Sequence, residues 1–186
     1  MQQINHYGVL PRQSRRILSR PATVKSSKFS IREEKLYRMG MREFLQLIAK
    51  ESDLIAVLAN TTAILNRSAK FFWVGFYLVK QKELILGPFQ GTPACTRIAF
   101  GKGVCGTAAV KRQTIIVPDV HKFPGHIACD RRSCSEIVVP VFDTAKRLRA
   151  VLDVDSTLPN AFGNRDKNYL ESITLMLRHK FKKKYT

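Results

Sequence analysis

The sequence has no apolar run long enough to cross a membrane as a helix. Its longest apolar stretch, residues 71–79, has the length of a β-strand, whereas a membrane-spanning helix needs about 20 apolar residues. The N-terminal region also lacks the apolar core of a secretory signal. Hydrophobic residues make up 45% of the chain and charged residues 25%, a composition typical of globular proteins. We therefore expect a folded domain with no membrane partner.

Acidic residues are scarce, with 14 Asp and Glu against 32 Lys and Arg, and the net charge is +18. Both ends of the chain lack acids: residues 1–32 hold seven Lys and Arg, and residues 178–186 hold five. Residues 33–177 therefore carry only about +6, a charge that solubility alone explains. A body that binds nucleic acid would instead interleave cations with aromatic residues. We expect no nucleic-acid partner.

The acid-free first 32 residues are rich in Arg and Ser. This composition is typical of either a disordered basic extension or a transit peptide that directs a protein to an organelle. We divide the chain into this extension (1–32), a folded domain (33–180) and a basic C-terminal tail (181–186). The transit-peptide interpretation predicts a mitochondrion or another organelle as the location.

Hydrophobic periodicity predicts an α+β fold. Apolar residues recur at helical spacing from residue 33 and again from residue 52, and β-branched and aromatic runs predict two hairpins. The expected elements are helices from residues 33 and 52, strands at 71–79 and 84–89, an apolar segment at 98–100, a short helix at 107–111, a strand at 114–117, a loop at 118–133, strands at 137–142 and 148–154, and a helix from about residue 164. This order predicts a single domain with a mostly antiparallel central sheet and helices packed on one face.

The glycine-rich segment at residues 101–106 matches the glycine spacing of a dinucleotide-binding loop, but its surroundings do not fit. Only about seven residues separate Gly106 from the next predicted strand, which is too few for a crossover helix. We interpret these glycines as allowing a sharp turn or a close backbone approach to a ligand.

The sequence also lacks the paired Cys-x-x-Cys motif of structural zinc sites. Spacing alone leaves a zinc site open as an alternative, in which His126, Cys129 and Cys134 are joined by Cys95, Cys105 or His121.

All four cysteines fall in the middle third of the chain. Clustered thiols without a secretion signal indicate redox or metal chemistry, with four buried apolar side chains as the alternative. Cys129 lies in an irregular loop beside Arg131 and Arg132, and neighbouring cations raise the thiolate fraction of a cysteine. Cys95 and Cys105 lie upstream as candidate resolving thiols that would convert a sulfenic acid into a disulfide.

Three acidic residues stand among apolar strand residues: Glu136, Asp153 and Asp155. Burying an acid is costly unless it is paired, so such acids are candidates for holding a cationic ligand or donating a proton. For Asp153 and Asp155 the alternative is a strand with one face turned to solvent.

Eight short segments, taken together and in this order, resemble the free methionine-(R)-sulfoxide reductases, a family built on a single GAF domain. They are WVGFY (73–77), LGPFQG and PAC (86–91 and 93–95), GKGVCGTA (101–108), VPDVH (117–121), FPGHIACD (123–130), SEIVVP (135–140) and VLDVDS (151–156). The resemblance spans about residues 35–178 and is therefore much more specific than any single motif.

The resemblance implies a mechanism. It makes Cys129 the nucleophile and Cys95 or Cys105 its disulfide partner, with Cys95 the first choice. It implies free methionine-(R)-sulfoxide as substrate and thioredoxin as reductant, with no metal and no organic cofactor. It also implies a cytoplasmic enzyme that is commonly a homodimer.

The resemblance also assigns the ligand pocket. Its acids fall on Glu136, Asp153 and Asp155, and its aromatic wall falls on Trp73 and Tyr77. A carboxyl with a raised pKa supplies the proton that a departing sulfoxide oxygen needs.

Two features near the nucleophile depart from the family pattern. Cys134 is an additional thiol and an alternative disulfide partner for Cys129. Arg131 and Arg132 replace small residues, and we expect them to lower the pKa of the Cys129 thiol or to steer an acidic reductase to the site. The alternative function is a non-catalytic GAF module that binds a small ligand in the same pocket.

Overall fold

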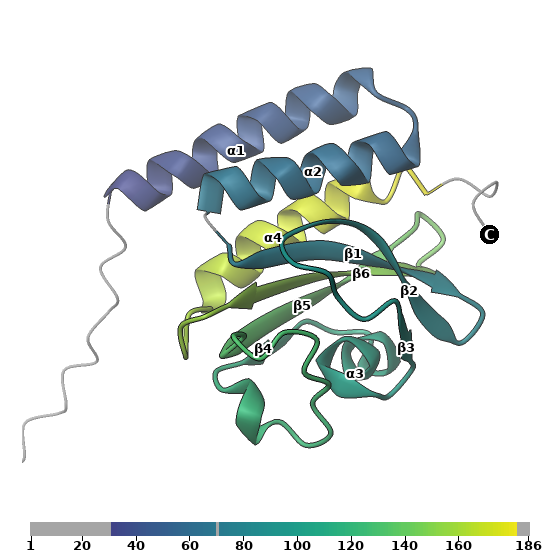
Figure 1. Ribbon diagram of the computed structural model, residues 1–186. Helices are drawn as coiled ribbons and strands as arrows, with labels where there is room; N and C mark the ends of the chain where they lie inside the picture. Colours follow the sequence, from purple (N-terminus) through teal and green to yellow (C-terminus); the bar gives the residue numbers. More distant parts are fainter. Residues whose placement is uncertain (1–30, 70, 182–186) are drawn as a thin grey trace, which may run out of the picture.

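The computed structural model describes residues 31–69 and 71–181. The expected basic extension, except for the start of the first helix, and residues 182–186 of the expected tail lie outside the described residues. Figure 1 shows a central sheet with a layer of helices on one face and a short helix with a long loop on the other. The described elements are α1 (Ile31–Lys50), α2 (Leu54–Ala69), β1 (Trp73–Lys80), β2 (Glu83–Gln90), β3 (Arg97–Ala99), α3 (Gly103–Lys111), β4 (Ile115–Val117), the 3-10 turn η1 (Val120–Lys122), β5 (Ser135–Phe142), β6 (Leu148–Ser156) and α4 (Asn164–Leu177).

The six strands form one sheet in the order β3-β2-β1-β6-β5-β4. Every neighbouring pair is antiparallel. The first hairpin (β1–β2) and the second (β5–β6) therefore meet along β1 and β6, in the middle of the sheet. Strands β5 and β6 are covered on both faces, which explains the nearly continuous burial along them.

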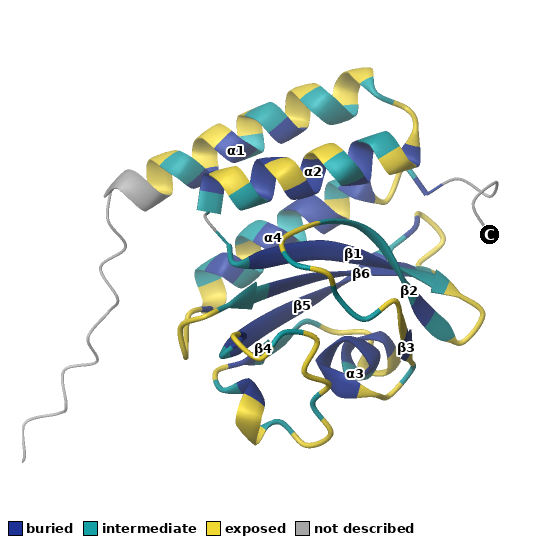
Figure 2. Ribbon diagram, in the orientation of Figure 1, coloured by how far each residue is buried: buried dark blue, intermediate teal, exposed yellow. Residues whose placement is uncertain are grey.

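Helices α1, α2 and α4 cover one face of the sheet (Figure 1). The larger apolar core lies between these helices and the strands, and it includes Phe44, Leu65, Phe76, Leu152 and Ile173, none of which is exposed. Figure 2 shows the buried residues running along the strands and the inner sides of these helices. The predicted α+β domain with a mostly antiparallel sheet is therefore confirmed. Among the described residues, no helix has both the length and the apolar character needed to span a bilayer.

The opposite face of the sheet carries α3, η1 and the irregular segment up to β5. A second, smaller apolar cluster forms here and contains Trp73, Tyr77, Val104, Ala108 and Val138. Because successive strand residues point to opposite faces, Tyr77 belongs to this cluster while its neighbour Phe76 belongs to the larger core. This second face holds the candidate site.

Helix α3 begins at Gly103, four residues before the predicted start at residue 107. Glycine disfavours helices, so the pattern at 101–106 predicted a turn, but packing requires the glycines inside the helix. A Cβ at Gly106 would lie 2.4 Å from the carbonyl oxygen of Ala99, and Gly103 has φ +59°. The glycines thus allow a close approach of α3 to β3, and Cys105 lies on a helix.

Candidate active site

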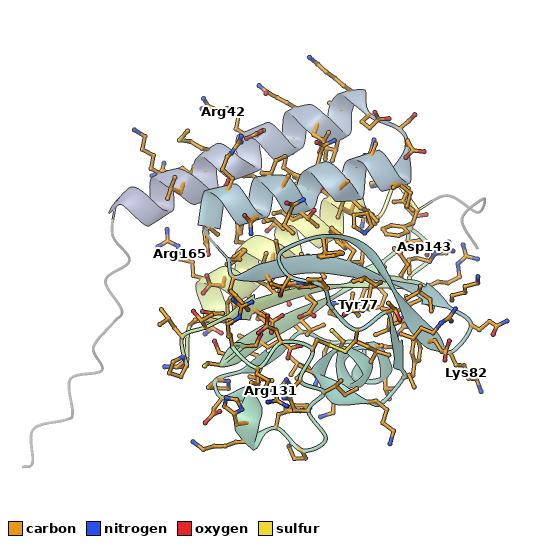
Figure 3. The ribbon with its side chains drawn as sticks, viewed as in Figure 1. Arg42, Tyr77, Lys82, Arg131, Asp143 and Arg165 are labelled. Carbon is orange, nitrogen blue, oxygen red and sulfur yellow. A yellow bond between two sulfur atoms is a disulfide. The ribbon has the colours of Figure 1, made fainter. Side chains whose placement is uncertain are left out.

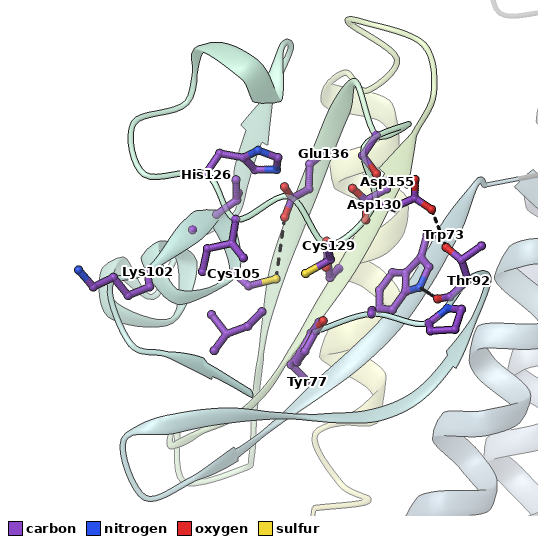
Figure 4. A pocket seen from close by; sticks show the side chains of 18 residues that line it. Trp73, Tyr77, Thr92, Lys102, Cys105, His126, Cys129, Asp130, Glu136 and Asp155 are labelled. Carbon is purple, nitrogen blue, oxygen red and sulfur yellow. Dashed lines mark hydrogen bonds between the residues drawn. The ribbon is translucent and has the colours of Figure 1, made fainter. Parts of the chain in front are cut away.

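A pocket opens on the second face of the sheet, between β1, β6, β5, α3 and the loops before β3 and β5 (Figure 4). The space between its lining atoms is about 520 Å³, including the open mouth. The lining contains seven of the eight residues that the sequence singled out: Trp73, Tyr77, Cys105, Cys129, Glu136, Asp153 and Asp155. Cys95, the eighth, is joined to Cys129 by a disulfide.

The three predicted acids come together because of strand register. Glu136 on β5 is paired with Asp155 on β6, and Asp153 lies two residues away on the same face of β6. Asp153 and Glu136 are 7% and 6% exposed. The alternative of a solvent-facing strand is therefore wrong for Asp153, because β6 is a central strand with a covered second face.

The aromatic wall is built on β1, opposite the acids. Trp73 pairs with Asp155 across the β1–β6 ladder, and Gly75 pairs with Asp153. A Cβ at Gly75 would lie 2.3 Å from the Trp73 ring, so only glycine lets the indole lie back over the strand. Tyr77 completes the wall, and its hydroxyl donates to the carbonyl oxygen of Cys95 at 3.0 Å.

Burial dominates the electrostatics of the acid cluster. Loss of water raises the pKa of Glu136 well above that of a free carboxyl, and the neighbouring Asp153 and Asp155 raise it further. Burial also raises the pKa of Asp155, as does Asp153. The pKa of Asp153 rises to about 6 through burial, opposed by hydrogen bonds from Cys105 and Glu136. The cluster therefore retains protons at neutral pH and can donate one.

Two atoms determine the hydrogen bonds that the cluster offers to a ligand: Asp153 Oδ1 and Cys105 Sγ. Asp153 Oδ1 is buried and accepts no hydrogen bond, although buried polar atoms normally have a partner. Cys105 is 3% exposed, and its Sγ donates to Glu136 Oε1 at 3.9 Å. Burial, followed by Asp153 and Glu136, raises the pKa of the Cys105 thiol. Cys105 is consequently a protonated thiol inside the cluster, and Asp153 is an open acceptor.

A disulfide joins Cys95, in the loop between β2 and β3, to Cys129, in the loop before β5, with their Cα atoms 5.5 Å apart. Figure 3 shows this bond below the sheet, beside Tyr77. Cys129 is exposed and Cys95 is half-buried, so a dissolved thiol has access to the bond. Cys105 and Cys134 are free thiols. The arrangement places an accessible redox pair next to protonated carboxyls, which is what reduction of a polar small molecule by a thiol requires.

The residues that depart from the family pattern do not line the pocket: they are Arg131, Arg132 and Cys134. Cys134 is half-buried and its Sγ donates to the carbonyl oxygen of Arg132 at 3.6 Å, and it does not line the pocket. Arg132 points back to Asp130, with Nη2 at 2.8 Å from Oδ2. Arg131 is exposed on the loop (Figure 3).

Several lining residues were not predicted from sequence. Thr92, Ile98, Lys102 and Val104 line the pocket, and Ser133 donates a hydrogen bond to Asp155. Lys102 and Val104 belong to the glycine-rich segment 101–106, which predicted a sharp turn or a close backbone approach to a ligand. Thr92, Ile98 and Ser133 stand in no chemically distinctive pattern.

Potential metal ligands converge at one place among residues 34–69 and 71–181. The thiol of Cys105 and the carboxyls of Glu136 and Asp153 have donor atoms within 4.8 Å of one another. His126 lines the same pocket but is not in this group, and burial together with His121 lowers the pKa of His126.

Comparison with known proteins shows the family of sequences to which this chain is similar. The pattern of the GAF domain family matches residues 51–175. The chain is 50% identical to GAF domain-containing protein A of Dictyostelium discoideum over 78% of its length and 92% of the relative. It is 46% identical to the free methionine-R-sulfoxide reductase of Escherichia coli, over 73% of its length and 82% of that protein.

A solved structure agrees with these sequence relatives. The free methionine-R-sulfoxide reductase from Neisseria meningitidis, in complex with its substrate, superimposes with a TM-score of 0.78. It is 45% identical in sequence, and the match covers 82% of this chain and 92% of that one.

Proposed function

Because the chain belongs to the free methionine-R-sulfoxide reductases of the GAF domain family, we propose that it reduces free methionine-R-sulfoxide by thiol chemistry at Cys129. The observation that carries the mechanism is the Cys95–Cys129 disulfide at a pocket containing three acids with raised pKa values. A thiol pair alone can serve many redox reactions, whereas the protonated carboxyls supply what sulfoxide oxygen needs in order to leave sulfur.

In the first step, the Cys129 thiolate attacks the sulfoxide sulfur and the sulfoxide oxygen is protonated. The substrate S–O bond breaks, and the oxygen is transferred as a hydroxyl group to the Cys129 sulfur. Methionine is released and Cys129 becomes a sulfenic acid, so Cys129 loses the two electrons that the substrate sulfur gains. We assign the proton to Glu136, because it is buried and its pKa is raised by both burial and its acidic neighbours. The proton that the Cys129 thiol loses when it becomes a thiolate replaces the one that Glu136 donates.

In the second step, the Cys95 thiol attacks the oxidised Cys129 sulfur. The S–O bond breaks, water leaves and the disulfide forms. A reductant with two thiols, which we propose is thioredoxin, then reduces this disulfide and is itself oxidised to a disulfide. The exposed position of Cys129 supports attack at that sulfur.

The pocket explains the preference for a free amino acid. The unpaired Asp153 Oδ1 and the neighbouring Asp155 offer acceptors to an ammonium group. Trp73 and Tyr77 offer an apolar wall to the methyl and methylene groups of the substrate. A methionine inside a polypeptide has no ammonium group and brings flanking chain that the pocket must exclude.

The test is a coupled assay with thioredoxin, thioredoxin reductase and NADPH. Wild-type protein should consume NADPH with free methionine-R-sulfoxide, and much less with the S epimer or with N-acetylated substrate. Cys129→Ser should abolish turnover, whereas Cys134→Ser, the matched control outside the pocket, should retain it. Absence of turnover in wild type, together with tight binding of the sulfoxide, would instead support a sensor module.

We also propose that thioredoxin is the reductant, that the chain forms a homodimer and that the protein acts in the cytoplasm. Replacing thioredoxin with glutathione and glutathione reductase should lower turnover. Light scattering on the purified chain should give twice its 21.2 kDa mass. The intact mass of protein from its native source should include residues 1–32, and loss of that segment would favour an organelle.

A further inference from the structure

Two loops meet at the mouth of the pocket, and a series of contacts beside the disulfide connects them. The loop between β2 and β3 carries Thr92 and Cys95, and the loop before β5 carries Cys129 and Asp130. Thr92 Oγ1 donates to Asp130 Oδ2 at 2.8 Å, as the dashed line in Figure 4 shows. The bonded residues lie three positions before Cys95 and one after Cys129, so this hydrogen bond lies next to the redox pair.

Both ends of the hydrogen bond are anchored to adjacent residues at the start of β1: Trp73, its first residue, and Phe72, which precedes it. On one side, the indole Nε1 of Trp73 donates to the carbonyl oxygen of Thr92 at 2.9 Å. On the other side, Asp130 accepts from the backbone and side chain of Arg132. The guanidinium of Arg132 in turn lies 4.9 Å from the centre of the Phe72 ring, a favourable cation–π distance. The contacts form a closed ring from Phe72 and Trp73 through both loops.

Two direct links join these loops. Between residues 91–96 and 118–134, all of them described, the only covalent or hydrogen-bonded links are the Cys95–Cys129 disulfide and the Thr92–Asp130 hydrogen bond. The disulfide breaks in every catalytic cycle, whereas the hydrogen bond needs no redox change. Its acceptor is charged, and the ion pair with Arg132, followed by the Thr92 hydroxyl, lowers the pKa of Asp130. Hydrogen bonds to charged groups are stronger than neutral ones.

We propose that Asp130, through its hydrogen bond with Thr92, is a positioning residue that keeps Cys95 within reach of Cys129 when the disulfide is open. The inference rests on the proposed function for its catalytic meaning, but not for its measurement. Holding two reacting groups together raises their effective concentration. The ring thereby favours disulfide closure after the first step, and it shortens the lifetime of the exposed sulfenic acid.

The test measures the Cys95–Cys129 disulfide without methionine sulfoxide. Purified protein is equilibrated in buffers of reduced and oxidised glutathione, and the oxidised fraction is measured by alkylation and mass spectrometry. Each disulfide formed consumes one oxidised glutathione and releases two reduced ones, so the midpoint gives the effective concentration of the thiol pair.

Three variants isolate the hydrogen bond. Thr92→Val keeps the side-chain shape and the backbone acceptor for Trp73 but removes the hydroxyl. Thr92→Ser restores the hydroxyl. Thr96→Val is the matched control: the same change in the same loop, at an exposed residue one position after Cys95.

Thr92→Val should lower the effective concentration about tenfold, the size expected for one hydrogen bond to a charged group. Thr92→Ser should recover most of it, and Thr96→Val should match wild type. Asp130→Ala should resemble Thr92→Val, and the double variant should add little. A purely structural role would instead lower the melting temperature of the oxidised protein and leave the glutathione midpoint unchanged.

An unchanged midpoint in both Thr92→Val and Asp130→Ala overturns the inference, even if the enzyme reduces methionine sulfoxide normally. Conversely, a shifted midpoint in a protein that produces no methionine upholds the positioning role and overturns the proposed reaction. A second readout uses reduced protein and one equivalent of methionine-R-sulfoxide without reductant. Thr92→Val should trap more Cys129 sulfenic acid with a 1,3-diketone reagent than Thr96→Val does, and equal trapping contradicts the inference.

Discussion

Glu136 and Asp155 lie directly opposite each other on β5 and β6, so two carboxyl groups share one rung of the ladder on the pocket floor. Like charges in opposed positions destabilise a sheet, and here both groups are also withdrawn from water, which raises the pKa of each. The protein therefore maintains an arrangement that favours protonated acids and opposes their ionisation. Both its stability and its activity should depend on pH for this reason.

Glu136→Gln should stabilise the protein at alkaline pH. The pKa of Glu136 is raised in the folded state, so its contribution to stability is full below the unfolded-state pKa of about 4.3 and is lost as pH rises through the folded-state pKa. Glutamine cannot ionise, so it stays neutral at alkaline pH. The variant should exceed wild type by on the order of 1–3 kcal/mol at pH 8, with the difference vanishing near pH 4.

Urea unfolding of the oxidised protein, followed by far-ultraviolet circular dichroism between pH 4 and 9, measures this difference. Glu83→Gln is the control, because Glu83 is an exposed acid paired with Arg97, and exposed pairs contribute little. A stability gain that is independent of pH would show that ionisation of Glu136 is not its source.

The same substitution should slow the chemistry. If Glu136 protonates the departing oxygen, Glu136→Gln should lower methionine formation in a single turnover by about a hundredfold or more. In wild type the rate should fall at alkaline pH, as the acid cluster loses its proton, and this limb should disappear in the variant. Rapid mixing of reduced protein with substrate, with methionine quantified by chromatography, provides the rates. If the variant keeps the alkaline limb, a group other than Glu136 is the proton donor.

The reduced cysteines should differ in reactivity toward iodoacetamide. Cys129 is exposed and Cys134 half-buried, whereas Cys105 is 3% exposed and burial raises the pKa of its thiol. Because the thiolate is the reacting species, Cys105 should be modified at least about tenfold more slowly than Cys129. Peptide mass spectrometry gives the three rates, and labelling in urea should make them similar. Fast modification of Cys105 in the folded protein would be incompatible with its buried position.

Arg131→Glu should slow reduction of the disulfide by an acidic protein partner. Arg131 is exposed beside the redox loop, whereas Arg132 is engaged with Asp130 and Phe72. Steering by exposed charge acts on the association rate and is screened by salt. The second-order rate with thioredoxin should fall severalfold at low ionic strength, and the loss should shrink in about 0.5 M salt.

Arg42→Glu is the matched control for that experiment, because Arg42 lies on α1 in the helical layer on the opposite face of the sheet (Figure 3). It makes the same change in net charge away from the disulfide. Equal slowing by both variants would attribute the effect to overall charge and not to Arg131.

Much of the fold was predictable because its signals are local. The helical periodicity of α1, α2 and α4 and the apolar, β-branched runs of the strands identify every long element, and the predicted hairpins correspond to β1–β2 and β5–β6. The start of α3 was not predictable, because the close approach of Gly106 to Ala99 is a tertiary contact that overrides the low helix propensity of glycine.

The site was partly predictable for a similar reason. Asp153 and Asp155 stand out in sequence because apolar residues flank them, but their burial depends on β6 lying in the middle of the sheet. Thr92 is an ordinary loop threonine in sequence. Its hydrogen bond to Asp130 joins residues 38 positions apart, and no spacing pattern encodes such a contact.

Trp73 gives the pocket a further property. It is the only tryptophan in the chain, and its ring lies on the pocket wall because Gly75 leaves room for it. Indole fluorescence responds to the polarity and quenching groups around the ring, and a disulfide is an effective quencher. Tryptophan emission from this protein therefore originates beside the reacting groups, so substrate entry and disulfide opening can each be followed in real time on the unlabelled, unmodified chain.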